Sequence, residues 1–236
     1  MPVDCAIILA GGKGERLWPL TNDRPKVMVE VAGKPILYWQ IEWLKSHGVK
    51  KFVLAVSYKY EVIQEFLEHG KKLGIEVDYS IEDSPLGRGG AIKKAFGSKL
   101  VEGAEDVIIA NGDIITKLDM TKMAKFHSEQ NALATLLLVP YLSRWGIVRL
   151  NEEDSIVGFE EKPKLPYWIN GGIYVFNKNI VPLLPDLGDH ETLTFPKLCD
   201  GKLRGFKSEG FWRAVDVIKD RSEAEKFLEE GREKFF

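Results

Sequence analysis

The sequence predicts an α/β protein built on a doubly wound, mostly parallel sheet, with a smaller β-rich lobe. Two observations indicate this. Over the first half of the chain, apolar runs of strand length alternate with helix-length amphipathic segments, a pattern typical of parallel strands joined by right-handed crossovers. In the second half, strand-like runs follow one another through short loops without long helices between them, which favours a partly antiparallel arrangement.

The first half contains four predicted strands and three predicted helices. The run DCAIILA (4–10) is continuously apolar after its first residue, as expected of a strand buried on both faces. The other predicted strands of this half are 51–57, 75–80 and 105–113. The predicted helices are 35–48, 61–70 and 89–96. Pro35 opens the first helix and Gly48 closes it, the usual positions of these residue types.

The second half contains the predicted β-rich lobe. Its strands are expected at 132–139, 146–150, 155–163 and 168–176. Towards the C-terminus we expect a helix over 191–201, a strand near 204–216 and a final helix from about Lys219. Because no linker rich in Gly, Ser or Pro separates the halves, we expect one domain over residues 1–236.

Composition restricts the possible function classes. The chain has 236 residues, enough for a large core, and its 33 basic and 35 acidic residues are well mixed, which argues against a nucleic-acid or membrane surface. The N-terminus lacks the basic region of a signal peptide, and no apolar run approaches the ~20 residues that span a bilayer. We therefore expect a soluble cytoplasmic protein in which Cys5 is a reduced, buried thiol.

A glycine-rich loop, in the stretch LAGGKGERLWPL, follows the first predicted strand. In this architecture ligands bind at that edge of the sheet. Gly11, Gly12 and Gly14 let the backbone approach a ligand closely and direct N–H groups at an anion. Their spacing matches neither the phosphate loop G-x-x-x-x-G-K-[S/T] nor the dinucleotide loop G-x-G-x-x-G. The sequence therefore indicates neither a P-loop NTPase nor a typical nicotinamide enzyme.

Two cations accompany the loop. Arg16 and Lys26 flank a connection that Pro19 and Pro25 stiffen, so the two basic side chains can be held at a fixed spacing. Each residue alone would be interpreted as a solvated surface charge. Together with the loop amides they suit a triphosphate that develops charge while it reacts.

The stretch GGKGERLWPLTNDRPKVMVEVAGKPI resembles the opening motif of the sugar-1-phosphate nucleotidyltransferases, G-G-x-G-x-R-L-x-P-L-T-x-x-x-P-K followed by V-x-G-K-P. The resemblance implies a Rossmann-like nucleotidyltransferase fold, with a nucleotide-binding half of about 1–115 and a sugar-phosphate-binding half of about 116–236. It implies that Arg16, Lys26 and Asp113 are the catalytic residues. The nucleotide-binding residues that it implies are Leu9, Gly11, Gly12, Gly14, Arg16, Lys26, Glu82, Pro85 and Gly87.

Two aspartates are candidate Mg²⁺ ligands. Asp113 directly follows a buried predicted strand, so its carboxylate can reach into the ligand crevice; a helix cap or turn is the alternative role. Asp216 ends a second strand-like stretch, and two carboxylates with phosphates and water are sufficient for Mg²⁺. The resemblance matches both positions to the metal-binding aspartates of the family. Val217 and Ile218 stand where the family usually has Gly-Thr or Thr.

Candidate sugar-phosphate residues lie in the second half. In GFEEKP, Lys162 could bind the sugar phosphate and Glu161 a sugar hydroxyl, although such a pair is more often a solvated turn. In WINGGIYVF, Asn170 and Gly171 interrupt a strand-like run, where glycine indicates either a bulge or close approach by a ligand. The resemblance implies that these four residues and Gly146 line the sugar pocket.

The implied reaction is attack of a sugar-1-phosphate oxygen on the α-phosphorus of a nucleoside triphosphate, with release of pyrophosphate. Such chemistry is mostly positioning and charge neutralisation, and it requires no protein nucleophile. A non-catalytic sugar-nucleotide sensor is an alternative, but the chain keeps Arg16, Lys26, Asp113 and Lys162, which such a protein would be free to lose. A homodimer is expected by base rate alone.

Motifs in different parts of the chain point to different nucleotides. IEDSPLGRGGAI resembles a segment of guanylyltransferases acting on mannose or heptose phosphates, with Arg88 in place of the usual Thr. WINGGIYVF and GFWRAVDVIKD resemble glucose-1-phosphate cytidylyltransferases. We predict that the substrates are GTP and mannose 1-phosphate. Cytidylyl, uridylyl or thymidylyl transfer to glucose 1-phosphate and guanylyl transfer to a heptose 1-phosphate are the alternatives.

Overall fold

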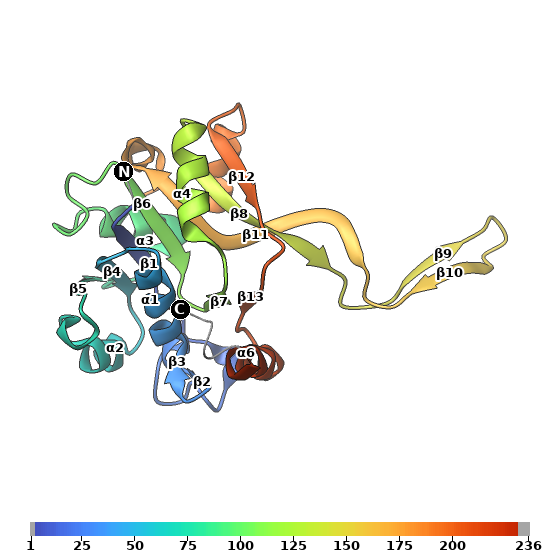
Figure 1. Ribbon diagram of the computed structural model, residues 1–236, viewed down its shortest axis with the longest axis horizontal. Coiled ribbons are helices and arrows are strands. Elements are labelled where there is room, and N and C mark those ends of the chain that lie inside the picture. The colour runs from blue at the N-terminus through green and yellow to red at the C-terminus, as the bar shows by residue number, and fades with distance from the viewer. Residues whose placement is uncertain (1–2, 231–236) are drawn as a thin grey trace.

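A seven-stranded mixed sheet forms the centre of the molecule in the computed structural model, which describes residues 3–230 (Figure 1). The strand order is β12-β8-β11-β6-β1-β4-β5. The strands are β1 (Cys5–Leu9), β4 (Lys51–Val56), β5 (Glu76–Ile81), β6 (Asp106–Asn111), β8 (Ala134–Leu142), β11 (Lys164–Asn177) and β12 (Leu203–Lys207). All run parallel except β11, which is antiparallel to both of its neighbours, β6 and β8.

Helices cover both faces of this sheet, as the doubly wound prediction requires. The helices are α1 (Ile36–Ser46), α2 (Tyr60–Leu67), α3 (Gly87–Ala95), α4 (Met120–Glu129), α5 (His190–Leu193) and α6 (Ile218–Glu230). Successive residues of β1 point to opposite faces: Ile8 packs in the apolar cluster with α1, α2, α4 and α6, whereas Ile7 packs in the cluster with α3. The α/β fold class is therefore confirmed, and the buried apolar runs form the central strands because both of their faces are covered.

The strands expected in the β-rich lobe divide between two places. β11 joins the main sheet beside β6, and β8 pairs with β11, so both extend the main sheet rather than forming a separate lobe. Only β9 (Ile147–Leu150) and β10 (Ile156–Glu160) lie apart, as an antiparallel hairpin that projects far from the rest of the molecule (Figure 1). The predicted helix over 191–201 is shorter than expected: α5 ends at Leu193, and a 3₁₀ turn that contains Pro196 follows.

Two short pairings position segments around the carboxyl edge of the sheet. β2 (Glu30–Val31) pairs with β3 (Lys34–Pro35), and β7 (Ile114–Thr116) pairs antiparallel with β13 (Trp212–Ala214). The second pairing brings residues 212–214 back to the segment that follows β6.

The structure also describes the cysteines and the length of the helices. Cys5 and Cys199 are both free, and burial raises the pKa of the Cys5 thiol to about 12. Among the helices of residues 3–230, none combines the length and the apolar character needed to cross a membrane.

Candidate active site

A cavity of about 580 Å³ opens at the carboxyl ends of β1, β4 and β6, the edge where parallel sheets bind ligands. Predicted nucleotide-binding residues in its lining are Leu9, Gly11, Gly12, Lys26, Glu82, Pro85 and Gly87. Gly14 and Arg16 lie further along the glycine loop and do not line this cavity. The lining also includes Ser57 and Tyr58, which follow β4 and which no sequence motif identified.

The glycine loop is held in place by short contacts to its neighbours. Ser57 Oγ donates a hydrogen bond to the Gly11 carbonyl at 3.0 Å, and a Cβ on Gly11 would meet that hydroxyl at 2.7 Å. The Lys26 amide donates to the Gly12 carbonyl at 3.1 Å. Gly14 has a φ of +70°, and a Cβ there would lie 2.9 Å from Lys26 Cβ. At Gly14 a side chain would therefore be both strained and crowded, and the loop path determines where Lys26 lies.

Asp113 and Asp216 converge on the ammonium group of Lys26. The β7–β13 pairing continues into a hydrogen bond from the Val215 amide to the Asp113 carbonyl at 2.9 Å, which places the two aspartates side by side. Lys26 Nζ donates to Asp113 Oδ2 and, at 2.6 Å, to Asp216 Oδ1. An Arg16 guanidinium nitrogen lies 2.8 Å from Asp216 Oδ1. The structure thus brings together the predicted catalytic residues and both predicted metal ligands.

Lys26, at the centre of this cluster, is shielded from water, whereas the Arg16 side chain is 68% exposed. The Lys26 side chain is 12% exposed. Burial opposes its charged form, but the charges and hydrogen bonds of Asp113 and Asp216 outweigh burial and raise the Lys26 pKa. Burial likewise opposes ionisation of Asp216, and the Lys26 hydrogen bond and charge, with that of Arg16, lower the Asp216 pKa overall. Lys26 is therefore a cation and Asp216 an anion at neutral pH.

A second cavity, of about 370 Å³, adjoins the first and shares Arg88, Asn111 and Asp113 with it. The predicted sugar-phosphate residues Asn170 and Gly171 line it. The other lining residues are Ile114, Gly172, Glu191, Trp212, Ala214 and Asp216. The two aspartates and Lys26 thus lie at the boundary between two chambers.

Arg88, at the start of α3, joins the two chambers. It binds Asp189 through Nε at 2.8 Å and Glu191 through a terminal nitrogen at 2.8 Å. Glu191 Oε1 also accepts from the Tyr174 hydroxyl at 2.7 Å and from Asn170 Nδ2 at 2.8 Å. The sequence showed only that Arg88 replaces the usual Thr. It did not indicate that Arg88 binds Asp189 and Glu191, at the start of α5.

Three predicted sugar-phosphate residues lie outside both chambers. Gly146, Glu161 and Lys162 belong to the projecting hairpin and its base, and none of them lines either cavity. Lys162 Nζ lies 3.2 Å from Glu161 Oε1, and both side chains are 58% exposed. A Cβ on Gly146 would lie 2.6 Å from the Phe159 ring, so glycine there permits close packing within the hairpin.

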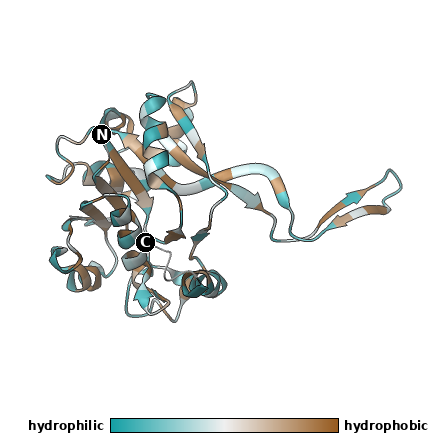
Figure 2. Cartoon of the chain, in the orientation of Figure 1, coloured by the Kyte–Doolittle hydropathy of each residue, from teal (hydrophilic) through white to brown (hydrophobic). Residues whose placement is uncertain are grey.

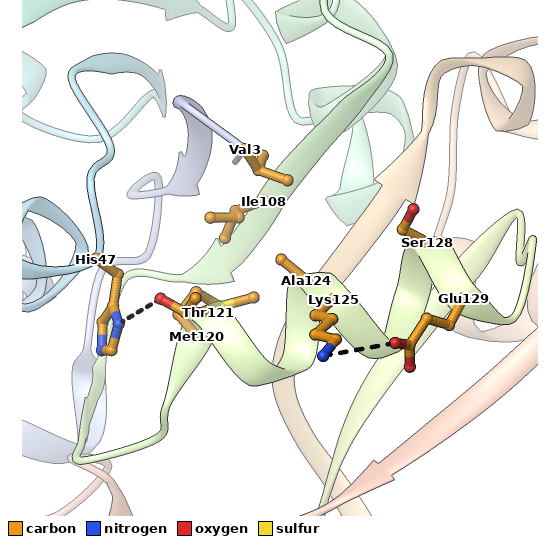
Figure 3. Close-up of a pocket in the computed structure, with 9 residues that line it drawn as sticks. All are labelled: Val3, His47, Ile108, Met120, Thr121, Ala124, Lys125, Ser128 and Glu129. Carbon is orange, nitrogen blue, oxygen red and sulfur yellow. Dashed lines mark hydrogen bonds and ion pairs between the residues drawn. The ribbon is translucent and has the colours of Figure 1, made fainter. Parts of the chain in front are cut away.

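A third cavity, of about 330 Å³, lies at the opposite, amino end of the parallel strands (Figure 3). α4 forms one wall, and His47 Nδ1 lies 3.2 Å from Thr121 Oγ1 at its rim. None of the predicted site residues lines it. The predicted site residues that line a cavity line the other two.

Known proteins resemble this chain in sequence and in fold. A family model described as "Nucleotidyl transferase" matches residues 5–230. The chain belongs to this family. This nucleotidyltransferase is 43% identical over 176 residues to the D-glycero-alpha-D-manno-heptose 1-phosphate guanylyltransferase of Campylobacter jejuni, covering 74% of this chain and 76% of that protein.

Relatives of this nucleotidyltransferase differ in length. The mannose-1-phosphate guanylyltransferase catalytic subunit beta of Dictyostelium discoideum is 37% identical over 91% of this chain, and the match spans only 62% of that protein. The heptose 1-phosphate enzyme of Aneurinibacillus thermoaerophilus is 34% identical, over 95% of this chain and 98% of that protein. Among solved structures, HddC from Yersinia pseudotuberculosis complexed with GMP-PN has a TM-score of 0.75 and 29% identity, covering 96% of this chain and 100% of that one. The predicted family and fold class are confirmed.

Proposed function

We propose that the chain is a sugar-1-phosphate guanylyltransferase, which joins GTP to the 1-phosphate of a manno-configured sugar and releases pyrophosphate. The observation that carries the proposal is the arrangement of Lys26, Arg16, Asp113 and Asp216 at the boundary between two adjoining chambers. Group transfer between two phosphate-bearing substrates needs such a boundary, with cations and metal ligands where the reacting phosphates meet.

The larger chamber takes the nucleotide. Gly11 and Gly12 allow a ligand to approach the backbone, and Glu82, Pro85 and Gly87 line the wall beyond them. Gly14 and Arg16 act from the same loop, which folds over the triphosphate. Arg16 and Lys26 bind phosphate oxygens as a planar fork and a compact charge, respectively. A guanine base is supported by the three relatives compared above, at 34–43% identity, each of which is named as a guanylyltransferase.

Asp113 and Asp216 suit a divalent metal. Their carboxylates already share one cation, Lys26 Nζ, and carboxylate oxygens with phosphate oxygens are the ligands that Mg²⁺ prefers. We propose that both aspartates hold Mg²⁺, which would neutralise charge on the triphosphate. With both carboxylates holding a metal, the Lys26 ammonium would be available to bind phosphate.

The transfer itself needs orientation more than covalent catalysis. A sugar-phosphate oxygen forms a bond to the α-phosphorus of GTP, and the bond from that phosphorus to the β-phosphate oxygen breaks, so pyrophosphate carries away the electron pair. Lys26 and Arg16 hold the α- and β-phosphates in line and offset the developing charge. No proton transfer to a protein side chain is required.

The smaller chamber takes the sugar 1-phosphate. Asn170 and Gly171 line it, and we propose that Gly146, Glu161 and Lys162 contribute to the same site when the hairpin reaches a sugar chamber. Mannose 1-phosphate is the substrate predicted from the sequence. A heptose 1-phosphate is the second candidate, and the 43% identity to the heptose 1-phosphate guanylyltransferase of Campylobacter jejuni supports it. We further propose that the protein acts in the cytoplasm as a homodimer.

Pyrophosphate release tests the proposal. GTP, CTP, UTP, ATP and dTTP would each be combined with mannose 1-phosphate, the heptose 1-phosphate and glucose 1-phosphate in the presence of Mg²⁺. We expect release with GTP and one of the two manno-configured sugars. Preference for CTP or UTP with glucose 1-phosphate would contradict the proposal, and release with no pair would favour a non-catalytic sugar-nucleotide sensor.

A further inference from the structure

Glu191 is a carboxylate in the wall of the smaller chamber, and the proposed reaction gives it no role. It lines that chamber and not the larger one. Its side chain is 26% exposed, so a ligand in the chamber can reach it. The other two carboxylates of the lining, Asp113 and Asp216, are the proposed metal ligands. Glu191 is therefore the carboxylate of this chamber that is left to contact the sugar itself.

The two oxygens of Glu191 differ in their hydrogen bonds. Oε1 accepts from the Tyr174 hydroxyl at 2.7 Å, from Asn170 Nδ2 at 2.8 Å and from a terminal nitrogen of Arg88 at 3.2 Å. Among the described residues, Oε2 accepts from Arg88 alone, at 2.8 Å. A carboxylate has about four acceptor positions, which its two oxygens share. Oε1 is thus fully occupied, whereas Oε2 keeps an acceptor position for a donor in the chamber.

The partners of Glu191 hold its carboxylate in one place. The two terminal nitrogens of Arg88 bind both oxygens as a fork, and Asp189 fixes Arg88 in turn, accepting from its Nε at 2.8 Å. Tyr174 is fully buried in β11, in a sheet whose central strands are hydrophobic (Figure 2). Glu191 is therefore anchored both to α3 and to the core, and its open acceptor position is preorganised.

Asn170 supports Glu191 from the other side. The two N–H groups of its Nδ2 donate to the Tyr174 hydroxyl at 3.0 Å and to Glu191 at 2.8 Å. Its Oδ1 accepts from the Gly172 amide at 2.9 Å. Both donors of Asn170 are thus used to hold its neighbours, and the open acceptor position is that of Glu191.

We infer that Glu191 accepts a hydrogen bond from a ring hydroxyl of the sugar and thereby helps to select it, with Arg88 as the positioning residue that holds the carboxylate. This inference rests on the proposed function. Arg88, Asp189 and Glu191 together carry one net negative charge, so this wall suits a hydroxyl group and repels the sugar phosphate. The phosphate belongs instead at the boundary between the chambers, beside Lys26 and Arg16.

A carboxylate in this position discriminates between sugars. A sugar that lacks the hydroxyl, or that carries it in the other configuration, would cover a charged acceptor without giving it a donor. Because leaving such a group unpaired is costly, the selectivity exceeds what a purely apolar wall could provide.

Glu191→Gln tests the inference. The remaining oxygen best serves the three donors from the Oε1 position, which places the amide nitrogen, a donor, where Oε2 was. Affinity for mannose 1-phosphate and for the heptose 1-phosphate would be measured by titration calorimetry with Mg²⁺. Each titration is made with and without α,β-methylene-GTP, in which the bond that transfer breaks is replaced. We expect the affinity for the accepted sugar phosphate to fall about 10- to 100-fold. In turnover, the KM for the sugar phosphate should rise and the KM for GTP should not, because Glu191 does not line the larger chamber.

Deoxy analogues identify the hydroxyl that Glu191 contacts. The 2-, 3- and 4-deoxy forms of the accepted sugar 1-phosphate would be titrated against both proteins. One of them should bind the wild type about 10- to 100-fold more weakly than the parent sugar phosphate does. The same analogue should bind Glu191→Gln within about threefold of the parent, because the contact is already lost.

Two further variants complete the experiment. Asp189→Asn is the matched control: it removes a carboxylate from the same arginine but lines neither chamber, so it should keep the wild-type affinities and the wild-type response to the deoxy analogues. Arg88→Lys keeps the charge without the fork, so it should show the Glu191→Gln pattern in weaker form. It also carries the test if Glu191→Gln does not fold.

The contrary results are distinct. Wild-type sugar affinities in Glu191→Gln and Arg88→Lys would overturn the inference. So would an equal loss for every deoxy analogue in the wild type and in Glu191→Gln, or a wild type that binds neither sugar phosphate. If the wild type binds a sugar phosphate but releases no pyrophosphate with any nucleotide, the proposed function fails, and the affinities still decide the role of Glu191.

Discussion

Lys26 and Asp216, which are 190 positions apart in the sequence, form a 2.6 Å ion pair at the boundary between the two chambers. The same ammonium binds Asp113, and Arg16 approaches Asp216 at 2.8 Å. Two cations and two anions therefore occupy the place where the proposed reaction puts phosphates and Mg²⁺. When the substrates bind, the two cations can pair with phosphates and the two aspartates with the metal. The ion pairs are then exchanged without leaving a buried charge unpaired.

Replacing Lys26 by Met tests this exchange. The change leaves Asp113 and Asp216 facing each other without their shared cation, and we expect a loss of roughly 2 kcal/mol in the free energy of unfolding. We also expect Mg²⁺ to raise the melting temperature of the variant more than that of the wild type, since the ammonium no longer competes for the carboxylates. Lys72→Met, which breaks an exposed pair with Glu68, is the control and should change stability by less than ~0.5 kcal/mol. Equal Mg²⁺ responses of Lys26→Met and wild type would contradict a shared site.

Asp113→Asn is expected to reduce pyrophosphate release by about 100-fold or more, because the amide is a poor substitute for a metal-binding carboxylate. The fold should survive, since the main-chain bond from Val215 to Asp113 is unaffected. Asp186→Asn changes an aspartate whose side chain is 90% exposed and should leave turnover unaltered. Near-normal activity of Asp113→Asn would remove this residue from the metal site.

His190 predicts how stability depends on pH. Its side chain is fully buried among aromatic rings, neither ring nitrogen has a hydrogen-bond partner among the described residues, and burial lowers its pKa to about 4. In the unfolded chain His190 therefore binds a proton near pH 6.5, whereas in the folded chain it binds one only near pH 4. The contribution of neutral His190 to the free energy of unfolding is fully present above about pH 6.5. It is lost as the pH falls from 6.5 to 4, by roughly 3 kcal/mol in total at 1.4 kcal/mol per pH unit.

Urea denaturation at pH 7 and pH 4.5 measures this dependence. The loss on acidification should shrink in His190→Phe, which keeps an aromatic ring and has no proton to bind. His69→Gln, at an exposed position, should behave as the wild type does. If His190→Phe loses as much stability as the wild type between these pH values, another group controls the response.

β1, β4 and β6 could be predicted because each is buried on both faces, so the apolar composition of each run indicates its burial. That β8 and β11 belong to the same sheet could not be predicted, because strand order depends on which long-range pairings bury the most surface. The sequence of a strand does not show which strand it pairs with.

The site divides in the same way. Gly11, Gly14 and Lys26 are close together in the sequence, so an ordered motif identifies them. Arg88 and Glu191 meet because α3 packs against α5. The spacing of residues within a motif cannot predict a contact between segments so far apart in the sequence. Lys162 was likewise recognisable as a candidate from its motif, whereas its position outside the lining of both chambers is a property of the folded chain.

Gly172→Ala tests how tightly the boundary between the chambers is built. Gly172 has a φ of +66°, and a Cβ there would lie 2.5 Å from Asn111 Nδ2, whose residue lines both cavities. We expect a loss of about 2–3 kcal/mol in the free energy of unfolding, from backbone strain and from displacement of Asn111, together with reduced turnover. Gly33→Ala is the matched control: its φ is +75°, but a Cβ there meets nothing within 4 Å, so it should lose only the strain, about 1 kcal/mol, and keep full activity. Equal losses in the two variants would show that Asn111 moves aside freely and that its position does not constrain the site.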